Sequence, residues 1–242
     1  MMGAVTDYDE LALFYDRIMG DASPRSRRIL DALDRFGPSP ESLLELGCGT
    51  GSVLEGLTSI PRLVGLDVSA AMLAIAARKV PTAELVQGDM ADFDLDETFD
   101  AIACVYDSIN HLSNFGLWEA LFRKVAKHLK SGGLFIFDLN TIGRLRILVE
   151  SPPAIQEFNG STLITNVTSE DGFLTTWDLK VFAPAGDGHF ALHHERISEL
   201  GVALQTVRLS LADHFELLHE EDTTGSDPND ASQRAYFIFR RR

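Results

Sequence analysis

Three glycines at alternate positions, Gly47, Gly49 and Gly51, directly follow an apolar run that ends at Leu46. Glycine adopts backbone angles that are closed to other residues, and it lacks the Cβ atom that would hold a ligand away from the main chain. The residues from Ser52 onward have helical character, and the first N–H groups of a helix are available to a ligand. A strand, a glycine loop and a helix in this order predict the opening of a nucleotide-binding βαβ unit.

A carboxylate stands where it could hold the ribose of such a nucleotide. Asp67 ends a second apolar run, twenty positions after Gly47, and a carboxylate at this place can accept hydrogen bonds from both ribose hydroxyls. The glycine spacing is G-x-G-x-G, with Glu45 two residues before the first glycine. A dinucleotide fingerprint is G-x-G-x-x-G, so the spacing argues against an NAD-dependent oxidoreductase.

The segments E-L-G-C-G-T-G and G-L-D-V-S together resemble the first two motifs of the class I S-adenosylmethionine-dependent methyltransferases. The resemblance implies S-adenosyl-L-methionine as the cofactor, with Asp67 on its ribose. It also implies that Asp89 accepts a hydrogen bond from the adenine amine and that Met90 covers one face of the ring. The residues that it brings to the cofactor are Tyr15, Glu45, Gly47, Cys48, Gly49, Gly51, Asp67, Val68, Met72, Asp89, Met90, Val105 and Tyr106.

Two residues are candidates for chemistry at the methyl acceptor, His111 and Tyr15. The segment Y-D-S-I-N-H-L, which contains His111, follows an apolar run over 99–105, at the edge where doubly wound sheets build their sites. Together with F-D-L-N-T at 137–141 it resembles the branch of glycine-type and nucleotide-linked amino-sugar N-methyltransferases. In that branch, residues matching Tyr15 and His111 lie near the acceptor amine. The resemblance covers residues 8–140. Residues 141–242 match that branch only in outline, as an antiparallel insertion before the last strands. It implies methyl transfer by in-line displacement to a small-molecule acceptor, with an amine favoured.

Several alternatives stay open at this point. Tyr15 could be a core aromatic residue, and His111 could be a packing or capping residue. The chain could be an O-methyltransferase of a small metabolite, or a cofactor-binding module without catalysis. Asp107, Asp138 and Asn140 could offer oxygen ligands to a metal, but their spacing is not that of the metal-dependent branch, so no metal is expected.

The composition predicts one globular domain without a nucleic-acid or membrane partner. The chain has 242 residues, of which 45% are hydrophobic, enough for a single large core. Its net charge of −15 repels phosphate backbones and anionic membranes. No apolar run approaches the ~20 residues of a membrane span, and the first residues lack the pattern of a signal peptide. A cytoplasmic location is therefore expected.

The order of the predicted elements indicates an α/β fold. Five apolar runs alternate with helical segments over 40–140, which predicts a doubly wound, mostly parallel, seven-stranded Rossmann-like sheet with helices on both faces. The single methyltransferase domain, 1–242, would begin with lid helices over 1–37, including one helix over 7–20 and a second capped by Ser23. A small antiparallel insertion over 150–200, with strands at 161–168, 173–183 and 189–199, would cover the acceptor site and could join two subunits in a homodimer. Residues 201–242 would add a helix and the last strands.

Overall fold

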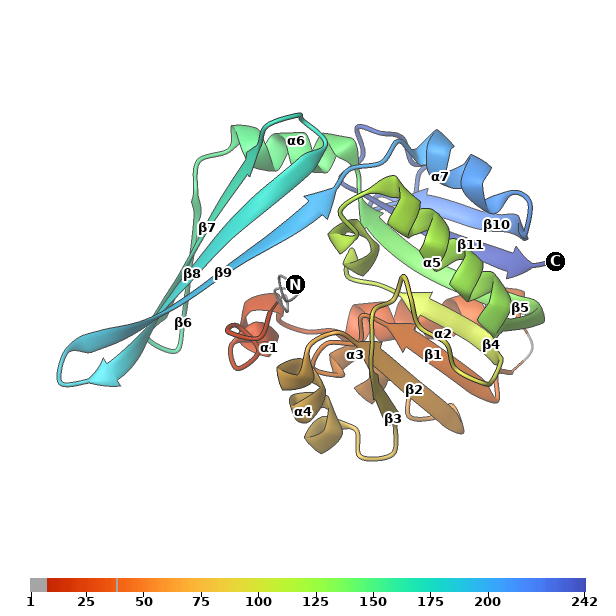
Figure 1. Ribbon diagram of the computed structural model, residues 1–242, viewed down its shortest axis with the longest axis horizontal. Helices are drawn as coiled ribbons and strands as arrows, with labels where there is room; N and C mark the ends of the chain where they lie inside the picture. Colours follow the sequence, from red (N-terminus) through yellow and green to blue (C-terminus); the bar gives the residue numbers. More distant parts are fainter. Residues whose placement is uncertain (1–7, 38) are drawn as a thin grey trace.

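A seven-stranded sheet forms the centre of the computed structural model, which describes residues 8–37 and 39–242 (Figure 1). The strand order is β10-β11-β5-β4-β1-β2-β3. One strand, β11, runs opposite to the other six strands of this sheet, so the prediction of a mostly parallel seven-stranded sheet is confirmed. The strands are β1 (Ser42–Leu46), β2 (Arg62–Asp67), β3 (Glu84–Gln87), β4 (Phe99–Cys104), β5 (Leu129–Asn140), β10 (Phe215–Asp222) and β11 (Arg234–Arg241).

Helices cover both faces of this sheet because its strands are apolar on both sides. Leu43 packs in one buried cluster with the first group of helices, while its neighbour Leu44 packs in another cluster with the second group. The first group is α2 (Ser23–Phe36), α3 (Ser52–Glu55) and α4 (Ala70–Lys79), and the second is α5 (Phe115–His128) and α7 (Leu204–Leu211).

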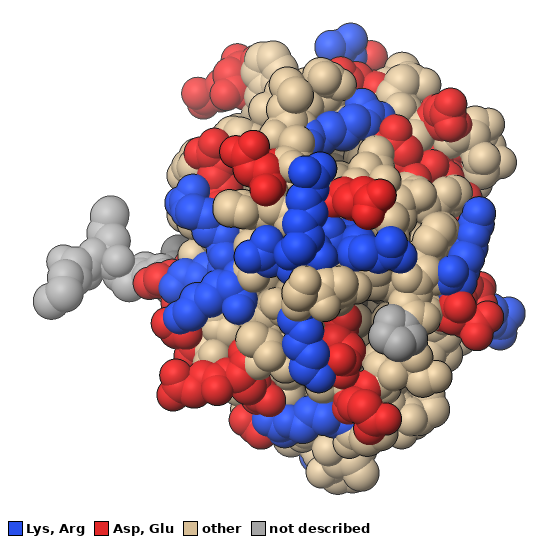
Figure 2. All heavy atoms as spheres, turned by 90° about the vertical axis from the view of Figure 1, so that its right-hand side faces the viewer, with Lys and Arg blue, Asp and Glu red and all other residues tan. Residues whose placement is uncertain are grey.

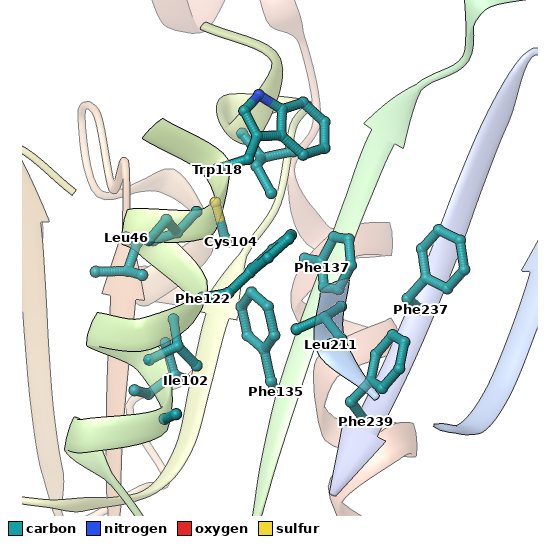
Figure 3. Packing of buried hydrophobic residues seen from close by; sticks show 14 of the residues in the cluster. Leu46, Ile102, Cys104, Trp118, Phe122, Phe135, Phe137, Leu211, Phe237 and Phe239 are labelled. Carbon is teal, nitrogen blue, oxygen red and sulfur yellow. The ribbon is translucent and has the colours of Figure 1, made fainter. Parts of the chain in front are cut away.

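Aromatic rings fill the core between α5 and the antiparallel end of the sheet (Figure 3). Phe122 of α5 packs against Trp118 of the same helix and against Phe135 of β5. Phe135 in turn stacks on Phe137, with ring centroids 4.6 Å apart. Phe137 also stacks on Phe237 of β11, at 5.1 Å. Packed aromatic pairs add to the free energy gained from burial alone, so this core fixes the position of β5 and of the site residues at its carboxyl end.

A second, antiparallel sheet follows β5 and α6 (Ile142–Glu150). It contains β6 (Ala154–Phe158), β7 (Ser161–Ser169), β8 (Leu174–Gly186) and β9 (His189–Leu200). The prediction of three strands was wrong, because β6 pairs with β7 across a tight turn with positive φ at Asn159 and Gly160. Since Ala154–Glu157 are all exposed, β6 lacks the alternation that marks a half-buried strand.

The predicted helix over 7–20 is also largely wrong. Only α1 (Tyr15–Met19) is helical, and residues 8–14 form turns. Leu11 and Phe14 are drawn into a buried cluster with Leu163 and Val181 of the second sheet, so tertiary burial overrides the helical periodicity. Figure 1 shows this segment between the second sheet and the central sheet.

The start of α2 differs from the prediction in one detail. Its N-cap residue is Ala22, and Ser23 is the first residue of the helix. The N–H of Ser23 donates a hydrogen bond to Asp21 Oδ1 at 2.8 Å. None of the helices in the described ranges is long and apolar enough to cross a membrane.

Candidate active site

The glycine loop joins β1 to α3 at the carboxyl edge of the sheet. Gly47 and Cys48 donate their N–H groups to the carbonyl of Leu66, at 2.8 and 3.1 Å, which ties the loop to β2. Gly49 has a φ of +53°, and a Cβ added there would have only a Tyr15 ring atom within 4 Å, at 3.9 Å. The main chain at Gly49 therefore borders open space, as a loop that cradles a ligand requires.

Asp67 stands beside this loop at the end of β2. Its Oδ2 accepts the N–H of Gly49 at 2.7 Å, and its Oδ1 accepts the N–H of Ser69 at 2.9 Å. Burial raises the pKa of Asp67, although these two hydrogen bonds oppose the shift. Each carboxylate oxygen still has capacity for another hydrogen bond, so Asp67 can receive two hydroxyls of a ligand.

A cavity of about 350 Å³ opens between the glycine loop, Asp67 and the amino-terminal segment. Of the sequence-predicted site residues, the structure brings ten to its wall: Tyr15, Gly47, Gly49, Asp67, Val68, Met72, Asp89, Met90, Tyr106 and His111. Seven others that the sequence reasoning missed also line it: Tyr8, Leu66, Gly88, Ser108, Leu112, Ser113 and Leu117.

Four residues predicted at the cofactor do not line this cavity. Glu45 and Cys48 are buried behind the loop, and Gly51 faces α4, where an added Cβ would lie 3.1 Å from the Ala76 Cβ. Val105 lines a different cavity beside α2. Burial raises the pKa of Glu45 well above its ordinary value, and the nearby charge of Asp67 raises it further. The Oε2 atom of Glu45 has no hydrogen-bond partner among the described residues.

His111 is oriented by hydrogen bonds at both ring nitrogens. It ends the short 3₁₀ helix η1 (Ser108–His111), and its Nδ1 lies 3.1 Å from the carbonyl oxygen of Ser198 on β9. Because a carbonyl only accepts, Nδ1 must carry the proton, and in the neutral ring Nε2 is left with a lone pair. Nε2 lies 3.3 Å from the hydroxyl of Tyr8, at the wall of the cavity.

Tyr15 is suited to contact rather than to proton removal. Burial raises its pKa strongly, and the negative charge of Asp107 raises it further, so the phenol stays protonated at neutral pH. The Tyr8 ring lies edge-on to Tyr15, with centroids 5.5 Å apart. Of the two predicted catalytic residues, only His111 offers a basic atom.

The loop that carries His111 begins with two strained residues, Tyr106 at φ +61° and Asp107 at φ +53°. Such conformations persist only where the surroundings enforce them. The N–H of Asp107 binds Asp138 Oδ1 at 2.8 Å, and Arg234 Nη2 binds Asp107 Oδ1 at 2.7 Å. The Asp107 and Asp138 oxygens thus face Arg234 and backbone N–H groups. Among the described residues, no group of three or more His, Cys, Asp or Glu side chains is arranged to hold a metal ion.

The side-chain amides of Asn140 and Asn110 connect this loop to the second sheet. Asn140 Nδ2 lies 2.8 Å from Asp107 Oδ2 and 2.8 Å from Glu199 Oε2. Burial raises the pKa of Glu199 well above its ordinary value, and the charge of Asp107 raises it further. Asn110 Nδ2 also donates to the carbonyl of Leu200 at 2.9 Å. The end of β9 is therefore part of the support of the His111 loop.

The helix α1 is fastened to the glycine loop by Asp16. Its carboxylate accepts hydrogen bonds from Lys79 at 2.6 Å, from Ser52 at 2.9 Å and from Thr50. Burial alone would raise the pKa of Asp16, but these hydrogen bonds lower it. Tyr15, the preceding residue, is thereby held against the cavity.

A second cavity of about 350 Å³ lies between α2 and strands β5, β10 and β11. Figure 2 shows Lys and Arg side chains gathered across the middle of the molecular face that it views. Two of the arginines that line the cavity are held by local contacts: Arg25 covers the Tyr106 ring at 3.6 Å, and Arg28 covers Tyr236 at 3.9 Å and pairs with Glu221.

Known proteins resemble this chain in sequence and in fold. Residues 43–133 match a family model described as "Methyltransferase domain". A dTDP-3-amino-3,6-dideoxy-alpha-D-glucopyranose N,N-dimethyltransferase from Streptomyces fradiae is 37% identical over 142 residues, 56% of this chain and 56% of that protein. The chain spans about half the length of the curated relatives it matches first.

Two solved structures superpose over nearly the whole chain. The sugar N-methyltransferase KedS8 from Streptoalloteichus sp has a TM-score of 0.78 at 27% identity, covering 100% of this chain and 96% of that one. An S-adenosylmethionine-dependent methyltransferase from Clostridium acetobutylicum has a TM-score of 0.86 at 23% identity, covering 96% and 98%, and shows the shared fold.

The sheet order, the glycine loop, Asp67 and these matches together show a methyltransferase domain of the class I, S-adenosylmethionine-dependent type over residues 43–133. The cofactor is S-adenosyl-L-methionine. The open main chain at Gly49 and the two ligand-accepting oxygens of Asp67 fit this group, and the cofactor supplies the methyl group when it is bound.

Proposed function

We propose that the protein transfers a methyl group from S-adenosylmethionine to the amine of a small-molecule acceptor, namely a nucleotide-linked amino sugar. The observation that carries the proposal is His111 Nε2, a lone pair held at the wall of the cofactor cavity by the Ser198 carbonyl. The relatives named as N,N-dimethyltransferases of dTDP-linked amino sugars support the choice of acceptor.

The site residues have separate tasks in this proposal. Asp67 and the glycine loop bind the cofactor, Asp89 and Met90 flank its adenine, and Tyr15 borders the reacting end. Alignment of the acceptor nitrogen for in-line displacement supplies most of the rate. An ammonium has no lone pair for this attack, so a base has to remove one proton, and His111 is that base.

The second sheet, over 150–200, covers the acceptor in this proposal. Acidic residues on it would, by charge alone, disfavour an anionic acceptor such as a sugar diphosphate. Two of them are neutralised locally, however. Asp178 pairs with Lys180, His194 and Arg196, and these contacts lower its pKa. The raised pKa of Glu199 favours its neutral form. The charge of these two residues therefore does not oppose a nucleotide-linked acceptor.

A matched pair of acceptors tests the proposal. Two dTDP-sugars that differ only in an amino or a hydroxyl group at one carbon are incubated with S-adenosylmethionine, and S-adenosylhomocysteine and the methylated sugar are measured by mass spectrometry. We expect methylation of the amine alone. Methylation of the hydroxyl alone would make the protein an O-methyltransferase, and cofactor binding without transfer to any acceptor would make it a binding module.

A further inference from the structure

The cavity beside α2 combines apolar walls with arginine side chains. Buried Ile136 and Ile238 line it from the sheet, and buried Ile29 lines it from the helix. Four arginines of α2 also line it: Arg25, Arg27, Arg28 and Arg35. The chain as a whole has a net charge of −15 and therefore repels anions. A site for an anion needs cations that are gathered locally, and this cavity has them.

The carboxylates that line the cavity do not balance these cations. Asp138 is paired with Arg234, and Glu221 is paired with Arg28. Asp31 is the remaining carboxylate of the lining and is exposed. The other three arginines therefore face one carboxylate, which leaves the cavity with an excess of positive charge.

Arg25 and Arg28, one helical turn apart, each lie over a tyrosine ring. The guanidinium carbon of Arg25 is 3.6 Å from the centroid of Tyr106, and that of Arg28 is 3.9 Å from the centroid of Tyr236. A ring beneath a guanidinium restricts its motion, while the N–H groups of the planar fork stay free to bind phosphate or carboxylate in bidentate fashion.

Most of the N–H donors of these two arginines are unused. Among the residues that the structure describes, no hydrogen bond or ion pair engages the guanidinium of Arg25, and the exposed Asp21 interacts with it through charge alone. Arg28 donates one N–H group to Glu221 and keeps its other donors. Two arginine forks with free donors therefore line the same cavity.

We propose that Arg25 and Arg28 form a clamp for the phosphate groups of a nucleoside diphosphate that binds in the cavity beside α2. Two arginine forks match the oxygens of a diphosphate. The rings of Phe36 and His219, which stack with centroids 5.9 Å apart, line the same cavity and offer a surface for a base. The cavity volume, about 350 Å³, equals that of the cavity assigned to the cofactor, itself a nucleoside.

The clamp adjoins the cofactor cavity. Tyr106, which lies under Arg25, also lines that cavity, so a single contact joins the two. A nucleoside diphosphate has two sources, the nucleotide end of the proposed acceptor and a free nucleotide that acts as an effector. Binding by the clamp does not depend on the proposed function, and kinetics separate the two sources.

Calorimetry with dTDP tests the clamp without an acceptor. Saturating S-adenosylhomocysteine keeps the cofactor cavity filled, and the ionic strength is held constant. Each of Arg25→Gln and Arg28→Gln removes charge-assisted hydrogen bonds and should raise the Kd for dTDP by about 10- to 100-fold. The matched control Arg123→Gln, at an exposed position on α5, should keep the wild-type Kd. Equal Kd values in all three variants, or a wild type that does not bind dTDP, would overturn the proposal.

A crystal structure of the full wild-type chain with dTDP and S-adenosylhomocysteine gives the same decision without a variant. The phosphates should lie within hydrogen-bond distance of Arg25 and Arg28. A dTDP molecule bound at any other place would overturn the clamp.

Steady-state kinetics with a dTDP-linked amino sugar then identify the source of the nucleotide. If the clamp holds the nucleotide end of the acceptor, dTDP competes with the acceptor and Arg25→Gln raises the acceptor KM. If it holds a separate nucleotide, dTDP changes kcat without competing. A wild type that methylates no amino sugar would refute the proposed function, whereas the clamp is still decided by the binding of dTDP.

Discussion

The carboxylate of Asp67 organises the cofactor cavity from both of its oxygens, which hold the N–H groups of Gly49 and Ser69. With a ligand bound, the same oxygens would accept two hydroxyls. Hydrogen bonds to charged groups contribute about 1.5–3 kcal/mol each and are not additive. Asp67→Ala should therefore weaken S-adenosylmethionine binding by about 2–4 kcal/mol in calorimetry.

The matched control for this variant is Asp34→Ala, on the exposed side of α2, which should bind the cofactor as the wild type does. Equal affinity in the Asp67→Ala and Asp34→Ala proteins would mean that the ribose is held elsewhere.

At the scale of single residues, the sequence predicted a site residue where the spacing of residue types alone indicates a binding site. Gly47, Gly49 and Asp67, which line the cavity, were predicted because alternate glycines after one strand and an acid at the end of the next are typical of a nucleotide site. The glycine pattern could not separate Gly49, which borders the cavity, from Gly51, which packs on α4. Tyr8 was missed as a partner of His111 because the contact joins residues 103 positions apart, a relation that no local pattern contains.

Among the elements, β9 is both an edge strand of the second sheet and a support of the His111 loop through Glu199. The pKa of Glu199 is raised mainly by burial and then by Asp107, so the folded chain holds this proton more tightly than the unfolded chain does. Stability is then highest at or below the ordinary glutamic acid pKa and is lost as the pH rises toward the folded pKa.

Glu199→Gln keeps the shape of the neutral acid and removes this titration. The variant should match the wild type near pH 5 and exceed it in melting temperature at pH 8–9, by a few degrees for each kcal/mol gained. Thermal unfolding across this pH range measures the difference. Glu119→Gln, on the exposed side of α5, should follow the wild type throughout. Parallel pH curves for all three proteins would show that Glu199 is ionised in the folded state.

The helices and strands also divide into those that the sequence pattern predicts and those that it does not. The parallel strands and α2, α4, α5 and α7 follow from periodicity, because each buries one stripe or both faces in a large core. β6 and the turns over 8–14 do not, because their structure depends on partners in the second sheet.

For the whole molecule, the second sheet projects away from the central sheet as a long hairpin of β8 and β9 (Figure 1). Phe190 and Leu192 are 59% and 54% exposed on β9, and Ile155 of β6 is 68% exposed. Exposed apolar side chains on a sheet edge favour pairing with another chain. We therefore expect a homodimer through this sheet in sedimentation velocity.

The double variant Phe190→Glu, Leu192→Glu should sediment as a monomer, while Leu209→Glu, at an exposed position on α7, should remain dimeric. A wild-type protein that is monomeric at every concentration would contradict the expectation.

We propose that one cavity holds the cofactor with its reacting end toward Tyr8 and His111. A crystal structure of the full chain with S-adenosylhomocysteine is the direct test. The ribose hydroxyls should lie within about 2.5–3.0 Å of the Asp67 oxygens, the adenine beside Asp89 and Met90, and the sulfur on the side of Tyr8 and His111. S-adenosylhomocysteine bound in the cavity beside α2, or a sulfur turned away from His111, would contradict it.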